Sequence, residues 1–357
     1  MTHEEISHYR LVSQKLYKTS SCLPQEIVKH LGAMQAQDYA MAKWAIGSRC
    51  DAGEKEIEEA INSGKIIRTH ILRPTWHFVS PDDIYWMLDL SAPQVKRFTS
   101  SAAKKYGFDE KKLNQANTSI EKLLAGNNHL TRDEIMQELG IKKTSSADFL
   151  SAAIMMNAEL DGLVCNGEMK GKQITYALLE ERVSKPNSKL NKEEALAKLA
   201  LRYFESHGPA TALDFSWWSG FAPTICQKTI NAIELQLNRI TIDNQQYWLK
   251  KDINNTDNFR ESVHFLPAFD EILISYKTRE ASFQTDHQSK VFTNNGIFKP
   301  IILENGKVIG IWKRTIKKDH AKIETELFKE IESNKKHILF EGIKSFETYL
   351  GTKIVIE

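Results

Sequence analysis

The feature that most constrains this chain is an order of predicted elements, helix, short turn, helix and two-stranded hairpin, that occurs three times. The middle copy is the clearest, because Thr131 and Glu134 have the spacing of a capping box at the start of a helix. Gly140 suits the end of that helix. The helix is expected over 132–139, a second helix from Ser145 to Gly162, and strands over 163–166 and 173–178. This order is typical of a winged helix-turn-helix.

The same order is predicted on both sides of the middle copy. Near the N-terminus, Pro24 suits the first turn of one helix and Asp38 the cap of the next, with wing strands over 66–72 and 75–79. Further along, Thr211 and Asp214 have the spacing to cap a short helix. A helix from Pro223 and a hairpin over 239–242 and 246–249, joined by 243–245, complete that copy. We therefore expect three winged helices in tandem.

The rest of the chain does not show this order of elements. Residues 91–128 are typical of a polar helical linker, and the acidic run 54–59 predicts an outward-facing helix. After about 255, β segments are expected over 263–266, 271–275, 299–303 and 307–313, with a turn at 305–306 and a closing helix over 336–350.

These elements predict an α+β fold in four parts. Residues 1–90 form the first winged helix, with a Gln-x-Gln motif, and 91–186 the helical linker and second winged helix. Residues 187–255 form the third winged helix, and 256–357 a β-rich C-terminal region with the closing helix.

Charge and composition exclude several classes of protein. The chain has 48 Lys and Arg against 46 Asp and Glu, so its formal charge of +2 excludes a histone-like protein but not a local basic face. It lacks an apolar signal region and a run of roughly 18 apolar residues, so we expect no membrane association. Four widely spaced cysteines predict reduced thiols in a cytoplasmic protein and no zinc site. The common phosphate-loop, dinucleotide-binding, zincin and serine-hydrolase motifs are missing.

Four stretches in order carry a family resemblance. They are LGAMQAQD (31–38), RTHILRPTWH (68–77), HGPAT with DFSWWSG (207–220), and LPAFDE (266–271) followed by GIW (310–312). Together they resemble the winged-helix DNA glycosylases of the AlkZ and YcaQ type, over about residues 8 to 350. The Gln-x-Gln spacing is similar to the AlkZ-like branch, whereas the YcaQ-like branch has Gln-x-Asp. Pro74 stands where a glycine is expected.

The resemblance implies both a shape and an activity. It implies a C-shaped protein whose basic concave surface binds double-stranded DNA carrying alkylated bases. The implied reaction is hydrolysis of the N-glycosidic bond of N7-alkylated purines, including bulky adducts and interstrand crosslinks. It implies no metal, nucleotide or organic cofactor, and we expect a monomer.

Gln35 and Gln37 are the predicted catalytic residues, a paired role that the resemblance implies. Residues two apart share one side only of an extended segment, so this segment must leave the preceding helix, as Gly32 permits. A glutamine amide donates and accepts hydrogen bonds in fixed directions and could hold a water against C1′ of the sugar. From spacing alone, two solvent-facing glutamines in the turn of a helix-turn-helix are the favoured interpretation, and it is the resemblance that favours the catalytic role.

Five further residues are candidates for catalytic or supporting roles. Asp38 favours a helix cap, but its carboxylate could also stabilise an oxocarbenium-like sugar. Thr75 and His77 share one face of a predicted strand, with Arg73 nearby, and His77 could face the glutamines, a phosphate or only the wing. The resemblance gives Asp270 a supporting role, where the residues alone suggest a turn or salt bridge.

Clusters of basic residues are the candidate DNA contacts. Lys170 and Lys172 lie in the middle wing, and Lys313, Arg314, Lys317 and Lys318 lie in or after a predicted strand. They could form a phosphate-facing rim or a hairpin that enters a groove, or simply a solvated β face.

Two other functions stay open at the level of sequence. A non-catalytic DNA-binding protein, such as a transcription factor, is the main alternative, because winged helices serve that role most often. A protein-interaction scaffold is a weaker one, favoured by the small net charge.

Overall fold

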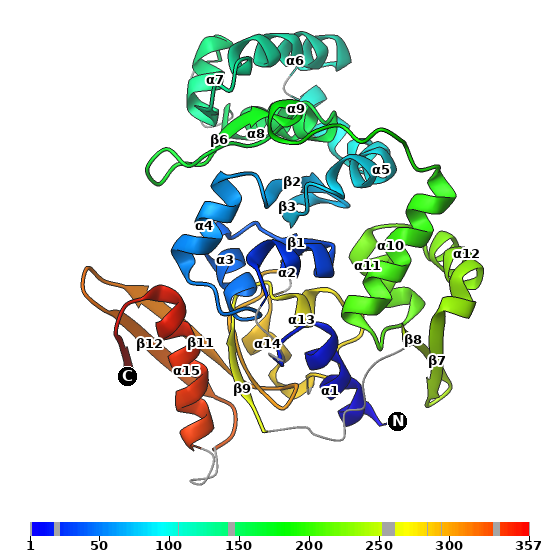
Figure 1. The fold of residues 1–357 in the computed structure, drawn as a ribbon, viewed down its shortest axis with the longest axis vertical. Coiled ribbons are helices and arrows are strands. Elements are labelled where there is room, and N and C mark those ends of the chain that lie inside the picture. Colours follow the sequence, from blue (N-terminus) through cyan, green and yellow to red (C-terminus); the bar gives the residue numbers. More distant parts are fainter. Residues whose placement is uncertain are drawn as a thin grey trace. The chain divides into compact units, whose positions relative to one another are not determined.

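The computed structural model describes residues 2–17, 22–105, 107–141, 147–251, 261–283, 285–293, 295–330 and 336–356 (Figure 1). The chain divides into two compact units. The first consists of Met1–Glu58 with Leu196–Glu357, and the second of Glu59–Ala195. The fold is α+β, with helices and sheets in both units.

The first unit begins with a helix that the sequence reasoning did not identify. Thr2 and Glu5 form a capping box at its start. Gly32, at φ 81°, ends the helix that Pro24 begins, and Asp38 caps the following helix through a bond from the Met41 N–H. The elements are α1 (His3–Ser13), α2 (Pro24–Leu31), β1 (Ala33–Gln35) and α3 (Tyr39–Gly47). The prediction that residues 35–37 leave the helix is confirmed.

The predicted helices and hairpin of 190–250 are present, and residues 196–250 of this stretch lie in the first unit. The Thr211–Asp214 capping box is confirmed. The hairpin turn is tighter than predicted, because Ile242 pairs with Gln245 and only Asp243 and Asn244, both at positive φ, form the turn. The elements are α10 (Lys192–His207), α11 (Ala212–Ser219), α12 (Pro223–Ile233), η1 (Glu234–Gln236), β7 (Leu237–Ile242) and β8 (Gln245–Lys250).

A five-stranded sheet of order β13-β12-β11-β10-β9 dominates the C-terminal part of the first unit. The strands are β9 (Val263–Leu266), β10 (Ile301–Glu304), β11 (Lys307–Ile316), β12 (Ala321–Leu327) and β13 (Ile354–Ile356). Asn305 and Gly306, at φ 48° and 80°, form the predicted turn. The closing helix α15 (Lys336–Leu350) is confirmed, and its Phe346 packs against Trp44 and Trp312.

The strand predicted over 271–275 is wrong. This segment forms the helix α13 (Glu271–Ile274), because the Asp270 side chain accepts the Ile272 N–H and caps it. The apolar run that suggested a strand is buried within the short helix. The remaining elements here are η2 (Thr285–His287) and α14 (Gln288–Val291).

The second unit contains the middle copy of the predicted order. The Thr131–Glu134 capping box is confirmed, whereas the helix start predicted at Ser145 lies outside the described residues. The elements are β2 (Ile67–Ile71), β3 (Arg73–Val79), α5 (Ile84–Lys105), α6 (Glu110–Leu124), β4 (Leu130–Thr131), α7 (Arg132–Glu138), α8 (Ala147–Leu160), β5 (Val164–Asn166), β6 (Thr175–Leu178) and α9 (Leu179–Arg182). The boundary between the two units along the chain falls within α4 (Glu54–Asn62), the expected acidic helix.

We expect Gly306→Ala to destabilise the protein more than Gly296→Ala. Both glycines have positive φ, so either alanine costs about 1–2 kcal/mol of backbone strain. At Gly306, however, a Cβ would also lie 2.8 Å from the Ser7 Cβ, whereas nothing lies within 4 Å at Gly296. Urea unfolding midpoints measure the difference, and equal midpoints would show that Ser7 does not restrict the turn.

Candidate active site

The Gln-x-Gln segment is an extended stretch between two helices. Gln35 is the last residue of β1, and Gln37 and Asp38 precede α3. Ala36 is fully buried, whereas Gln35 is half-buried and Gln37 is exposed. This alternation indicates that both amides lie on the side opposite Ala36, as the predicted pairing requires. Asp38 is exposed and accepts the Met41 N–H at 3.1 Å, so it serves as a helix cap.

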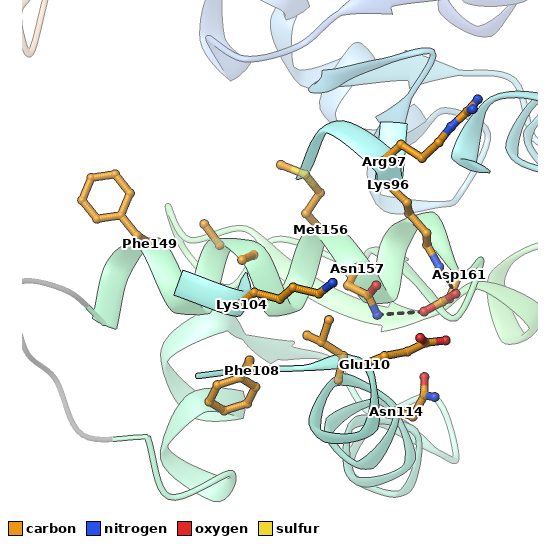
Figure 2. A pocket seen from close by; sticks show the side chains of 13 residues that line it. Lys96, Arg97, Lys104, Phe108, Glu110, Asn114, Phe149, Met156, Asn157 and Asp161 are labelled. Carbon is orange, nitrogen blue, oxygen red and sulfur yellow. Dashed lines mark hydrogen bonds and ion pairs between the residues drawn. The ribbon is translucent and has the colours of Figure 1, made fainter. Parts of the chain in front are cut away.

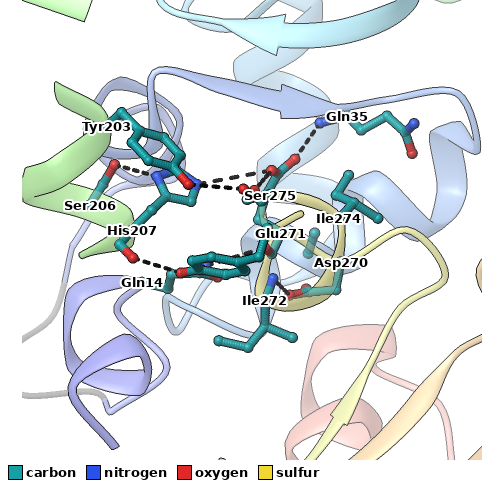
Figure 3. A network of polar contacts seen from close by, with 12 residues as sticks. Gln14, Gln35, Tyr203, Ser206, His207, Asp270, Glu271, Ile272, Ile274 and Ser275 are labelled. Carbon is teal, nitrogen blue, oxygen red and sulfur yellow. Dashed lines mark hydrogen bonds and ion pairs between the residues drawn. The ribbon is translucent and has the colours of Figure 1, made fainter. Parts of the chain in front are cut away.

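The backbone of Gln35 is hydrogen-bonded, whereas the oxygen of its side chain has no partner among the described residues. Its backbone N–H donates to Glu271 Oε1 at 2.7 Å (Figure 3). Its side-chain Oε1 is buried and has no hydrogen-bond partner within the described part of the chain. A buried acceptor without a partner costs about 1–3 kcal/mol, which a hydrogen bond from water or substrate would offset.

Glu271 lies beneath this segment, in the first turn of α13. It is 2% exposed. Its Oε1 accepts the Gln35 N–H, and its Oε2 accepts the Ser275 hydroxyl. His207 Nε2 lies 4.0 Å from the same Oε2. The carboxylate therefore joins β1 to α13 and faces the C-terminal end of α10.

Asp270 is clamped by Arg49, which follows α3. Arg49 Nη1 and Nη2 donate to the two carboxylate oxygens at 2.9 and 2.8 Å, and both side chains are almost completely buried. Asp270 Oδ1 also caps α13 through Ile272. Since the protein itself uses both oxygens, Asp270 is placed to orient α13.

His207 belongs to the same polar network. Its ring stacks on Tyr203 at 4.9 Å between centroids, and Nδ1 lies 2.8 Å from Ser206 Oγ. Burial above all, and then the nearby charges of His30 and Arg49, hold the pKa of His207 well below its usual range. His207 is therefore a neutral ring at pH 7.

The candidate residues of the β2–β3 hairpin lie in the second unit. Thr75 and His77 share one face of β3, and Thr69 of β2 pairs directly with His77. His77 is buried, and its Nδ1 lies 2.8 Å from the Thr75 carbonyl oxygen. The hydroxyls of Thr69 and Thr75 are buried without a hydrogen-bond partner in the described residues. Burial first, and then the positive charge of Arg73, hold the pKa of His77 well below its usual range.

The other face of β3, which carries Trp76 and Phe78, is only partly buried. Phe78 is fully buried, but Trp76 is half-buried, and the centroid of its ring lies 4.4 Å from that of His70. Its Nε1 donates to Glu159 Oε1 at 3.2 Å. The structure thus places Gln35, Gln37, Asp38 and Asp270 in the first unit and Arg73, Thr75 and His77 in the second.

Most of the predicted DNA contacts are on the surface. Lys313, Lys317 and Lys318 are exposed on β11 and the turn after it, whereas Arg314 lies over Phe346 at 5.6 Å. Lys170 and Lys172 are exposed in the wing between β5 and β6. Lys170 forms an ion pair with Glu134 and lowers the pKa of that carboxyl to about 2, so part of its charge is compensated.

A cavity of about 460 Å³ in the second unit lies between α5, α6 and α8 (Figure 2). Apolar side chains such as Phe108 and Met156 line it together with Lys96, Arg97 and Lys104. Lys96 pairs with Asp161, which also accepts the Asn157 amide at 2.8 Å. None of the predicted site residues lines this cavity.

The described residues contain neither a metal-binding cluster nor a membrane-spanning helix. No group of three or more His, Cys, Asp or Glu there could hold a metal ion. Among the described helices, none is long and apolar enough to cross a membrane.

Sequence reasoning missed three residues of the network. Glu271 belongs to the DE pair that ends LPAFDE, but the pattern led to a supporting role only for its neighbour Asp270. His207 stood in the HGPAT run and was given no role. Arg49 had no local signal, because its partner Asp270 is 221 residues away.

We expect Arg49→Met to lower the free energy of unfolding by about 3–5 kcal/mol, because it leaves the Asp270 carboxylate buried without its partner. Asp38→Ala, which removes an exposed cap, should cost only about 1 kcal/mol. Urea unfolding followed by circular dichroism compares the two. Equal losses would contradict the anchoring role of the ion pair.

Comparisons with known proteins agree on one family. The family model described as DNA glycosylase AlkZ-like matches residues 28–340. A curated relative, the interstrand DNA cross-link repair glycosylase of Streptomyces sahachiroi, is 21% identical over 328 residues, which cover 87% of each chain. The solved structure of Streptomyces sahachiroi DNA glycosylase AlkZ has a similar fold, with a TM-score of 0.80 at 18% identity over 100% of both chains. The chain belongs to the AlkZ-like DNA glycosylase family.

Proposed function

We propose that this protein hydrolyses the N-glycosidic bond of N7-alkylated purines in duplex DNA, with bulky adducts or interstrand crosslinks as substrates. Gln35 and Gln37 would position the attacking water. The observation that carries the proposal is the buried Gln35 Oε1, which has no hydrogen-bond partner in the described residues and can accept from a water. Membership of the AlkZ-like family and the cross-link repair relative support it.

The chemistry suits neutral amides. An N7-alkylated purine already carries a positive charge, so it leaves the sugar without being protonated. The enzyme then has to place a water and tolerate an oxocarbenium-like transition state. Gln35 accepts one water hydrogen, and the exposed Gln37 amide is free to contact the water or the DNA backbone.

The hairpin face of the second unit would offer bound DNA polar side chains that do not act as strong acids. His77 is neutral at pH 7 because its pKa is held low, so it can accept or donate a hydrogen bond but adds no charge. The buried hydroxyls of Thr69 and Thr75 offer further donors on that face. Arg73 supplies the positive charge near it.

The proposal includes the organisation that the resemblance implies. The three helix, helix and hairpin segments would act as winged helices in a C-shaped, monomeric and cytoplasmic enzyme that needs no cofactor. The domain divisions at 90, 186 and 255 belong to the same proposal. Exposed Lys313, Lys317 and Lys318 would contact phosphates beside the lesion.

We expect the wild-type protein to release 7-methylguanine from duplex DNA, and Gln35→Ala and Gln37→Ala each to slow release roughly 10²-fold under single-turnover conditions. Gln227→Ala, which changes an exposed glutamine of α12, is the matched control and should retain the wild-type rate. No release by the wild type would favour a non-catalytic DNA-binding protein, whereas full release by both variants would contradict the catalytic role of the two glutamines.

We expect Lys317→Ala with Lys318→Ala to weaken DNA binding and to reduce the slope of log K against log salt by about 0.9 for each lost phosphate contact. The control is Lys55→Ala, because Lys55 lies on the acidic helix α4 and should not face DNA. Fluorescence anisotropy over a salt series measures both effects. An unchanged slope in the double variant would place the DNA elsewhere.

A further inference from the structure

We propose that Glu271 is a positioning residue for the glycosylase reaction. Its carboxylate accepts the backbone N–H of Gln35 and so holds Gln35 in place. This inference rests on the proposed role of Gln35. Glu271 lies directly under the motif and contacts its main chain at 2.7 Å (Figure 3). It acts on the position of the Gln35 side chain and does not itself touch the reacting atoms.

The hydrogen bonds around Glu271 fix its carboxylate in one orientation. Oε1 accepts from the Gln35 N–H, and Oε2 accepts from the Ser275 hydroxyl of the same short helix. These two contacts tie β1 to α13 through one buried side chain, so the position of the Gln35 backbone depends on Glu271.

His207 lies near the Glu271 carboxylate but does not hydrogen-bond to it. His207 Nε2 lies 4.0 Å from Glu271 Oε2, which is beyond hydrogen-bond distance, and the His207 ring contacts Ser206 Oγ through Nδ1 at 2.8 Å. His207 at 4.0 Å thus does not compete with Gln35 as a donor to Glu271.

The backbone before α13 is strained in a way that fits this role. Phe269 has φ 57°, a conformation that costs a non-glycine residue about 1–2 kcal/mol. The strained turn delivers Asp270 to Arg49 and Glu271 to Gln35 in consecutive positions. Strain held in place by such contacts is typical of functional sites.

The experiment compares Glu271→Ala, Glu271→Gln and the control Glu205→Ala, a carboxylate of α10 that pairs with Lys250. We expect Glu271→Ala to slow single-turnover release of 7-methylguanine roughly 10²-fold, because a small displacement of a positioning group is this costly. Its DNA dissociation constant should stay within about twofold. Glu271→Gln keeps an acceptor for the Gln35 N–H and should restore the rate to within about tenfold of wild type.

Hydrogen exchange tests the contact without relying on activity. Peptides containing Gln35 should exchange faster in Glu271→Ala than in wild type, while peptides from α12 should not change. Wild-type rates in Glu271→Ala, or a loss matched by weaker DNA binding, would overturn the proposal. So would unchanged exchange at Gln35. If the wild type releases no base, the proposed function fails, but the exchange result still decides the contact.

Discussion

The Arg49–Asp270 ion pair is the interaction on which the candidate active site depends. It joins the residue after α3 to the cap of α13, with both side chains almost completely buried. Removing water from two charges is costly, and it is repaid only because the pair is bidentate and Arg49 also donates to Gln14. The geometry around α13 is therefore narrowly specified.

This ion pair closes a ring of contacts around the Gln-x-Gln segment. The segment leads directly into α3, α3 leads to Arg49, and Arg49 holds Asp270. The next residue, Glu271, returns to the segment through the Gln35 N–H. Both ends of the segment are thus fixed by contacts within one unit, and a catalytic side chain on it gains a defined starting position.

Local signals allowed much of the fold to be predicted. Capping boxes such as Thr211–Asp214 and turn residues such as Gly32 and Asn305 act over a few residues, so the sequence shows them directly. The extended state of residues 35–37 followed from the paired role that the resemblance implies, with Gly32 as the local signal that permits it.

The remainder depends on distant contacts. The run Ile272–Ile274 is typical of a buried strand, and only the Asp270 cap, fixed by Arg49, makes it helical. The role of Glu271 was missed for a similar reason, because its partner Gln35 is 236 residues away. Spacing within a segment carries no information about such partners.

The backbone contact to Gln35 also bears on how such a site can evolve. Glu271 recognises an N–H that every residue except proline has, so the scaffold holds position 35 without reference to its side chain. A substitution at position 35 can therefore change the chemistry of the site without removing this contact. The position of residue 35 is thus set by its backbone N–H and Glu271, whereas the chemistry at that position is set by its side chain.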